Sequence, residues 1–271
     1  MNNNFRALTY EEYFVYNAEY LPLTGATGTT FTDFLVKIAK GTDFNDFKFY
    51  GITYIADDSR IRMRILDDSF GRYLQRGSPD MRAIAGRPIT GDFSMAAHHN
   101  DFLPFIWPVP YRVSPGATLT IQASDFSGSN NNARIAFHGA KVRQGPAPWL
   151  KNYRYRIPFI YEIDLGAIAA SSSLVGVLST DTDADFLVQT VTGVRTGAAT
   201  ILIQEGARGR DWMDRATHFD NVVGTSYHPN NMLMKTPRFI TRGGNVSINV
   251  TDLSGAANTV RVYFVGMKLY A

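Results

Sequence analysis

The feature that most constrains this chain is a stretch that occurs twice. The sequence from Pro110 to Lys141 aligns without a gap on the sequence from Pro237 to Lys268. Most non-identical pairs are conservative, such as Val113 with Ile240. One structural unit is therefore used twice. The identical pairs are Pro110/Pro237, Gly116/Gly243, Ile121/Ile248, Asp125/Asp252, Ser127/Ser254, Gly128/Gly255, Asn131/Asn258, Arg134/Arg261, Phe137/Phe264, Gly139/Gly266 and Lys141/Lys268.

Each copy of this stretch predicts a β-hairpin. Apolar residues alternate with polar ones along its first half, which is the period of a half-buried strand. A turn of the form Asp-x-Ser-Gly follows at Asp125 and at Asp252, where Asp and Ser bond their own backbone and Gly accepts a positive φ. A closing strand then places Ile135 and Phe137 on one face of the first copy. Nothing in the hairpin indicates catalysis.

Further matches extend the duplication over the whole chain. They pair Phe14-Val15-Tyr16 with Phe159-Ile160-Tyr161, Phe47 with Phe186, Ile65 with Ile203, and Gly71-Arg72 with Gly209-Arg210. Short apolar runs bounded by Gly, Pro, Asn or Asp are typical of a sandwich or barrel, and helix signals are scarce. The sequence around Pro146 and Pro148 predicts a short, stiff connector. We therefore expect an all-β protein with two tandem, jelly-roll-like β-sandwich domains, residues 1–145 and 146–271.

Two regions depart from the duplication. Residues 1–12 are expected to form an arm before the first strand, either frayed or bound to a partner. Residues 78–107 are expected to be an insertion without a counterpart in the second copy. It contains His98-His99 and ends in a run of aromatic residues and prolines that includes Trp107. Long insertions of this kind often carry binding functions.

Bulk composition excludes several classes of function. The chain has no cysteine, so disulfides and thiolate chemistry are excluded. A net charge of +3 is too small to indicate nucleic-acid binding, which needs a clustered basic stripe. The amino end lacks the basic and apolar regions of a signal peptide, and no apolar run reaches the ~18 residues of a membrane-spanning helix. We expect neither a membrane nor a nucleic acid as partner.

Three motifs suggest chemistry, and each has a structural alternative. Adjacent histidines on an extended chain point in opposite directions, which disfavours His98-His99 as a metal site. Alternating carboxylates from Asp181 to Asp185 suggest calcium, but the glycine and distal glutamate of a calcium loop are absent. Residues Gly206 to Arg210 lack the Gly-Lys-Ser/Thr ending of a phosphate loop and predict a turn. With no Gly-x-Ser-x-Gly motif either, we expect no enzyme activity, no cofactor and no metal.

Two surface clusters are candidate contact sites. Arg60, Arg62 and Arg64 alternate with apolar residues, which predicts either a solvated face or a charged contact with a neighbouring subunit or acidic partner. After the connector follow Tyr153, Arg154, Tyr155 and Arg156. This cluster is typical of an interdomain or intersubunit contact, with stacking on nucleic-acid bases as the alternative.

The outward face of the closing strand differs between the copies. It carries Arg134, Ala136 and His138 in the first copy. In the second copy the face carries Arg261, Tyr263 and Val265, so that strand is apolar on both sides. Such strands are usually covered. We therefore expect a neighbouring subunit to cover this face of the second copy, and the second copy to be the more deeply engaged.

Three segments carry a resemblance to a known class of proteins. They are the extended strand from Phe159 to Gly166, the strand from Asp185 to Val188, and the closing hairpin from Val246 to Lys268 with Asp-Leu-Ser-Gly at its turn. Together they resemble virion structural proteins of tailed bacteriophages, of the capsid cement, decoration or minor capsid type. The resemblance implies a non-enzymatic homo-oligomer in the virion, with the major capsid protein or neighbouring copies as partners.

Other functions remain open at this point. The chain lacks the long spine helix of the major capsid protein of tailed phages, but a double jelly roll also suits the major capsid protein of a tailless, membrane-containing phage. A tail or neck adaptor is another candidate. Tandem sandwiches with exposed aromatic residues, here Trp107, Trp149 and Trp212, also bind carbohydrate.

Overall fold

The chain folds almost entirely into antiparallel β-sheet. The computed structural model describes residues 8–18, 21–23, 30–40, 44, 46–56, 60–81, 105–128, 130–206, 210–223 and 234–271. In these ranges the strands lie in four antiparallel sheets, and the short helices described in full are η1 (Pro148–Leu150) and α2 (Phe219–Val222). The expected all-β class with little helix is confirmed.

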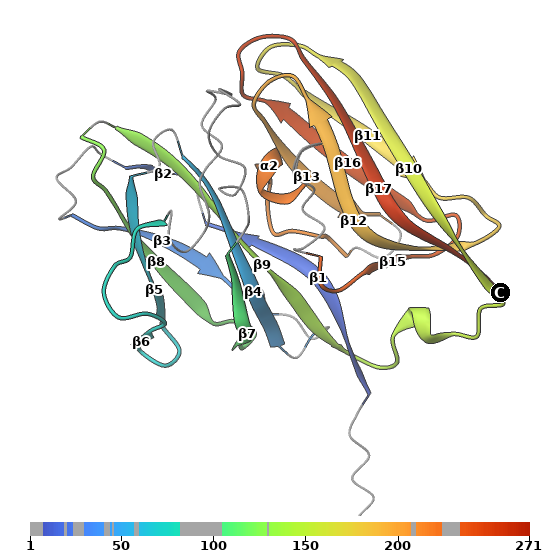
Figure 1. Ribbon diagram of the computed structural model, residues 1–271, viewed down its shortest axis with the longest axis horizontal. Helices are drawn as coiled ribbons and strands as arrows, with labels where there is room; N and C mark the ends of the chain where they lie inside the picture. Colours follow the sequence, from blue (N-terminus) through green and yellow to red (C-terminus); the bar gives the residue numbers. More distant parts are fainter. Residues whose placement is uncertain are drawn as a thin grey trace, which may run out of the picture.

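The strands form two sandwiches with the same topology. The first contains β1 (Thr9–Asn17), β2 (Leu21–Leu23), β3 (Thr32–Lys37), β4 (Asp46–Ala56), β5 (Ile61–Asp67), β6 (Arg72–Tyr73), β7 (Phe105–Val113), β8 (Thr118–Asp125) and β9 (Asn131–Gln144). The second contains β10 (Tyr155–Ile168), β11 (Ser173–Ser179), β12 (Asp185–Arg195), β13 (Ala199–Glu205), β14 (Thr217–His218), β15 (Arg238–Ile240), β16 (Asn245–Asp252) and β17 (Asn258–Tyr270). The two sandwiches lie side by side (Figure 1).

The strand order shows that each sandwich is a jelly roll. Sheet A has the order β1-β9-β4-β7, with β2 also paired to β9, and sheet B has the order β3-β8-β5-β6. Sheet C, β10-β17-β12-β15, repeats the order of sheet A, and sheet D, β11-β16-β13-β14, repeats that of sheet B. Four strands in the first of these orders, facing four strands in the second, are the arrangement of a double Greek key.

The strand register confirms the matches between the two copies. Residues matched by sequence occupy identical places opposite matched partners. Phe14 lies opposite Gly139 and Phe159 opposite Gly266, Phe47 lies opposite Lys141 and Phe186 opposite Lys268, and Ile65 lies opposite Ile121 and Ile203 opposite Ile248.

The Asp-x-Ser-Gly turn is built in the same way in both jelly rolls. The Asp125 carboxylate accepts hydrogen bonds from the backbone N–H and the hydroxyl of Ser127 and from the Asn131 amide. Asp252 accepts the corresponding bonds from Ser254 and Asn258. The turn glycines have φ of 84° and 71°, which a residue with a Cβ rarely adopts. These contacts explain why the turn residues are identical in the two copies.

Each jelly roll also repeats one close backbone approach beside a β-bulge. The bulges lie between Phe49 and Gly51 in β4 and between Val188 and Thr190 in β12. Next to them a Cβ added to Gly139 would lie 2.4 Å from the Lys48 carbonyl oxygen. At Gly266 the corresponding Cβ would lie 2.0 Å from the carbonyl oxygen of Leu187. Only glycine fits there.

Some expectations need correction, and others lie outside the described residues. Strand β1 begins at Thr9, within the segment expected to be an arm. Residues 78–81 do have a counterpart, because the bridge between Arg62 and Asp80 repeats the pairing of Thr200 with His218. The rest of the expected insertion up to residue 104, including His98-His99, and residues 1–7 lie outside the described part of the chain.

Candidate functional site

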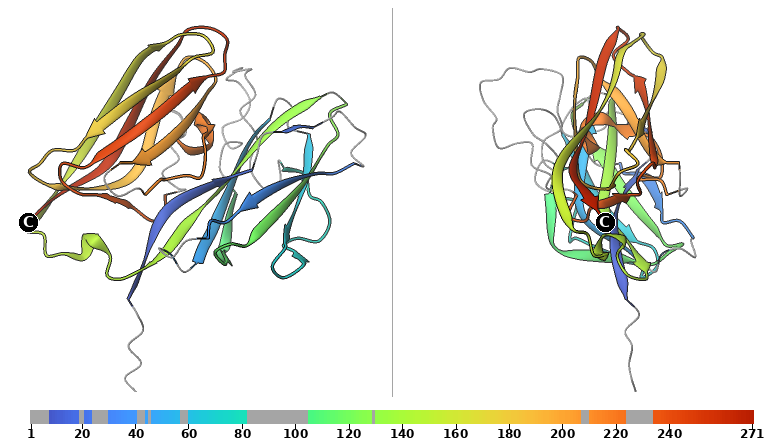
Figure 2. Two further views of the ribbon diagram at one scale, coloured as in Figure 1. Left: turned by 180° about the vertical axis from the view of Figure 1, so that it is seen from behind. Right: turned by 90° about the vertical axis from the view of Figure 1, so that its right-hand side faces the viewer.

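The second jelly roll covers one face of the first. On the outer face of sheet A, Ala136 and His138 of β9 are fully buried. Strand β1 would otherwise be an exposed sheet edge, but the Val15 N–H donates to the Trp212 carbonyl at 2.9 Å and the Asp214 N–H donates to the Val15 carbonyl at 3.1 Å. Both views in Figure 2 show β1 beneath the second jelly roll. The second domain thus caps an edge that would otherwise invite pairing with another chain.

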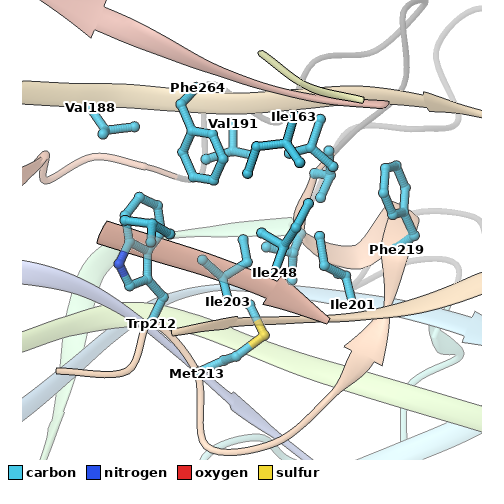
Figure 3. Packing of buried hydrophobic residues seen from close by; sticks show 14 of the residues in the cluster. Ile163, Val188, Val191, Ile201, Ile203, Trp212, Met213, Phe219, Ile248 and Phe264 are labelled. Atoms are coloured by element: carbon cyan, nitrogen blue, oxygen red, sulfur yellow. The ribbon is translucent and has the colours of Figure 1, made fainter. Parts of the chain in front are cut away.

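Apolar packing continues from the second core into this contact. Figure 3 shows Trp212 and Met213 beside Ile203, on the side of the core nearer the first jelly roll. The Trp212 side chain meets the Phe264 ring edge-on, with ring centroids 5.7 Å apart. Buried residues of the first domain, Val15 among them, belong to the same apolar cluster. The core of the second jelly roll therefore continues onto the outer face of sheet A, whereas the interior of the first jelly roll forms a separate cluster.

Buried charges also join the two domains. Glu12 and Arg143 of the first domain form an ion pair, and both are almost fully buried. The fully buried guanidinium of Arg238, from the second domain, lies 3.4 Å from the Glu12 carboxylate and 3.3 Å from that of Glu205. Burial alone would raise the pKa of the Glu12 carboxyl, but Arg238 and Arg143 outweigh it and lower that pKa. The Glu12 carboxyl is therefore ionised at neutral pH.

One histidine is buried at the centre of the contact. The Nδ1 of His138 lies 2.8 Å from the Tyr13 hydroxyl, and its Nε2 lies 2.9 Å from the Thr53 hydroxyl. The Thr53 hydroxyl also donates to the Asn221 carbonyl of the second domain. Burial lowers the pKa of His138 to about 3, with the Asn221 carbonyl acting weakly in the opposite direction. The imidazole is therefore neutral at neutral pH.

We expect this histidine to make the fold sensitive to acid. An unfolded histidine has a pKa of about 6.5, so below that pH the unfolded chain binds a proton that His138 does not accept in the fold. From about pH 6.5 down to about pH 4, the free energy of unfolding should fall by about 1.4 kcal/mol per pH unit from His138 alone. His218, whose pKa is lowered to about 4 chiefly by burial, adds to this loss. Urea titrations of wild type and His138→Gln at several pH values measure the slope, and an unchanged slope in the variant would exclude His138 as its source.

The described residues leave the equivalent face of the second jelly roll uncovered. Tyr263 and Val265 occupy the places of Ala136 and His138 but are only half-buried. Ile160 occupies the place of Val15 and is 58% exposed. Among the described residues, this face is therefore more deeply buried in the first copy, because the second domain supplies the cover for the first. Cover of the second copy by a neighbouring subunit stays a prediction.

Arg261 and the arginines of β5 lie on surfaces. The Arg261 guanidinium is 3.0 Å from the Asp164 carboxylate, which raises the pKa of Arg261. Arg62 lies over the Phe126 ring and Arg64 over the Phe31 ring, both on the outer face of sheet B. Arg60 precedes β5 and is exposed. The side chains between these arginines are fully buried, as the alternation predicted.

The basic and aromatic residues after the connector split into two groups. Tyr153 packs against the small cluster around Leu187 and donates its hydroxyl hydrogen to Asp185 at 2.8 Å. Arg154, Tyr155 and Arg156 are exposed, and the Tyr155 ring stacks on that of Tyr270. Whether a partner covers this group stays a prediction.

The three tryptophans differ in exposure. Trp212 is only 1% exposed. Trp107 and Trp149 are half-buried and meet Phe49 and Tyr10 edge-on. Packing inside the protein thus accounts for much of each tryptophan surface.

The carboxylates from Asp181 to Asp185 each contact donors of the protein. Asp181 lies 2.6 Å from the Lys268 ammonium, Asp183 lies 3.5 Å from it, and Asp185 accepts from the Tyr153 hydroxyl. Within the described ranges no three His, Asp or Glu residues are grouped as metal ligands. The alternating carboxylates therefore serve as ion-pair and hydrogen-bond partners between strands.

A cavity of about 330 Å³ lies where the two domains meet. Asn17 and Arg134 of the first domain and Arg215 of the second are among its lining residues, together with two threonines.

Among the described helices, none is long and apolar enough to cross a membrane.

Comparison with known proteins identifies no family. No protein-family model matches the sequence, and a search of curated proteins found no match.

The chain is similar to three solved structures at low TM-scores. The PBSX exported protein XepA is 13% identical, with 93% of this chain and 86% of XepA aligned and a TM-score of 0.27. A structure of Macrobrachium rosenbergii nodavirus is 8% identical over 98% of this chain and 92% of the other, with a TM-score of 0.25. The major capsid protein P2 of bacteriophage PM2 is 11% identical over 94% of this chain and 98% of P2, with a TM-score of 0.20. Likenesses this distant carry no argument about function.

Proposed function

We propose that this protein is a non-enzymatic structural protein of a bacteriophage particle. It binds and stabilises neighbouring subunits as a capsid cement, decoration or minor capsid protein. The observation that carries the proposal is the uncovered surface of the second jelly roll, whose edge strands β10 and β11 expose apolar side chains. Ile160, Val175 and Val177 are each more than half exposed. Apolar side chains exposed on two unpaired sheet edges favour interaction with another protein.

Strand β11 supports the proposal by contrast with its counterpart. Its sequence, SLVGVLS, has no charge and no proline, although β11 is the edge strand of sheet D. The equivalent edge strand β3 carries Asp33 and Lys37. Charged side chains protect sheet edges from pairing with other chains. The unprotected edge in the second jelly roll therefore favours a partner at that side.

Replacing Tyr263 by lysine should weaken assembly without unfolding the chain. The Tyr263 side chain lies half-buried on the outer face of sheet C, so a lysine there reaches solvent in the free protein. At a subunit contact the same lysine would bury a charge without a partner, which costs several kcal/mol. Incorporation of the variant into particles, compared with its urea unfolding curve, measures both effects. Normal incorporation would exclude this face from the contact.

Location in the particle tests the proposed function directly. Mass spectrometry of purified virions should detect the protein, and cryo-electron microscopy should place it on or beside the capsid. Absence of the protein from purified particles would overturn the proposal.

The complete jelly roll in each half favours one second candidate, a double jelly-roll major capsid protein. Sheets A and B repeat in sheets C and D with the same strand order. A major capsid protein would dominate the protein mass of the particle, whereas a cement or minor protein would not. Light scattering of the purified protein adds a further distinction, since a stable trimer favours the major capsid role.

A further inference from the structure

The contact between the two domains indicates what covers the open face of the second jelly roll. Val15 and Ile160 occupy the same register position in β1 and β10, opposite His138 and Val265. The N–H and C=O of Val15 point away from β9. They form hydrogen bonds with the backbone on either side of Met213. By the same register, the N–H and C=O of Ile160 point away from β17 toward the open side. The described part of the chain pairs no segment with that side of β10.

The first jelly roll contains the counterpart of the covering segment. The Trp212 N–H donates to Ile203, and the Leu74 N–H donates to Ile65 in the same way. Since Ile65 and Ile203 are equivalent, Leu74 corresponds to Trp212, Gln75 to Met213 and Arg76 to Asp214. Arg76 is exposed, and Leu74 and Gln75 are partly exposed. The first domain thus presents at its surface the element that the second domain uses for docking.

Charges are complementary at the position next to the bridge. Within the chain, the Asn17 amide donates to the Asp214 carboxylate at 3.0 Å. The equivalent of Asn17 is Glu162, and the equivalent of Asp214 is Arg76. A contact built in the same way between two copies would therefore place a carboxylate opposite a guanidinium, which is favourable for docking.

The residues equivalent to the ion pair between Glu12 and Arg238 are also compatible with a contact between two copies. Glu12 and Arg238 form a buried ion pair inside the chain. Their equivalents are Ile157, which is 43% exposed, and Tyr111, which is partly buried. An apolar and an aromatic side chain would replace the ion pair, so neither would leave a charge unpaired.

We propose that a second copy of this chain docks its first jelly roll on the open side of β10 and sheet C. Residues 74–76 of one copy lie beside Ile160 of the other, and Arg76 faces Glu162. The interface is head-to-tail, so successive copies form a closed ring or an open filament. Pro158 lacks an N–H and limits the backbone pairing on this edge to a short bridge, as at Val15. The inference names a partner for the surface used in the proposed function, but self-association requires no other virion protein.

Cysteine cross-linking tests this contact, because the chain contains no cysteine of its own. A mixture of the single variants Gln75→Cys and Ile160→Cys should form a disulfide-linked dimer under mild oxidation, since a disulfide needs Cα atoms about 4.4–6.8 Å apart. The double variant Val15→Cys/Met213→Cys is the positive control and should cross-link within one chain. Val177→Cys replaces Ile160→Cys as the negative control, because Val177 is equally exposed at a different edge. Cross-linking no faster than with Val177→Cys would overturn the proposal.

Charge-reversal variants test the proposed contact independently of cross-linking. Glu162→Arg or Arg76→Glu alone should weaken self-association about fivefold, and the double variant should restore it. Lys37→Glu, an exposed reversal on β3, should leave it unchanged. Sedimentation velocity over a concentration series measures the effect. A wild-type chain that stays monomeric up to its solubility limit would refute self-docking, yet it leaves the virion role intact if particles contain the protein.

Discussion

Replacing Arg238 by alanine is expected to destabilise the protein by about 3–5 kcal/mol and to separate the two jelly rolls. The reason is that Glu12 and Glu205 would remain buried without their common cation. Arg238 also donates to the Tyr13 carbonyl at 3.2 Å and lies over the Trp212 ring. Urea unfolding measures the loss of stability. Limited proteolysis in the connector around residues 145–154 measures the separation of the domains.

The matched control for this variant is Arg242→Ala. Arg242 follows β15 closely and is exposed, and its backbone N–H donates to the Asp185 carboxylate at 2.9 Å. Its removal should change stability by less than about 0.5 kcal/mol. Equal effects of the two variants would show that the interdomain charge cluster contributes nothing specific.

Replacing Gly266 by alanine is expected to cost at least about 3 kcal/mol, the upper end of the usual cost of overpacking. The added Cβ would lie 2.0 Å from the Leu187 carbonyl oxygen. That oxygen belongs to the backbone of β12, and β12 is hydrogen-bonded to β17, the strand that contains Gly266. Neither strand can move away without breaking the ladder of sheet C. Thermal unfolding and expression yield measure the effect.

Two further glycines provide the comparison. Gly139→Ala should cost a similar amount, because its Cβ meets both the Lys48 carbonyl and the Phe47 ring at 2.4 Å. Gly206→Ala should be tolerated, since its Cβ has no neighbour closer than 4.0 Å. If Gly266→Ala were as stable as Gly206→Ala, the close approach in sheet C could not be the reason for glycine there.

The interdomain contact defines how the chain can act in an assembly. An apolar cluster that spans the contact, a buried ion cluster and a neutral buried histidine hold the two jelly rolls together at neutral pH. Surfaces available to partners are therefore those that this contact leaves open. They include the edges β10 and β11 and the arginine-bearing face of sheet B.

Much of the fold could be predicted from local patterns. The alternation in the hairpins indicates which residues face each core, and identical turn residues indicate that both hairpins close in the same way. The matches at Phe14, Phe47 and Ile65 extend this equivalence to strands far apart in the sequence, and the register confirms each of them. Periodicity within one strand is enough for such predictions, because side chains on alternate faces meet different surroundings.

The candidate interaction surface was harder to predict. Nothing in the sequence of β9 indicated that Ala136 and His138 would be covered. In the structure the second domain lies on these two residues and buries both. Cover of Tyr263 and Val265 by a neighbouring subunit stays a prediction. The sequence pattern of one strand carries no information about which other domain lies against its outer face.

The sequence by itself determined that one unit occurs twice, that each unit is a β-sandwich, and which residues fill its core. These properties follow from local alternation, turn chemistry and the recurrence of the same residues. The tertiary structure was needed to show that Glu12, Glu205 and Arg238 meet, that β1 is capped while the outer side of β10 has no partner strand among the described residues, and that His138 is buried. Each of these depends on the relative placement of the two jelly rolls. That placement arises from side chains far apart in the sequence, which no local period records.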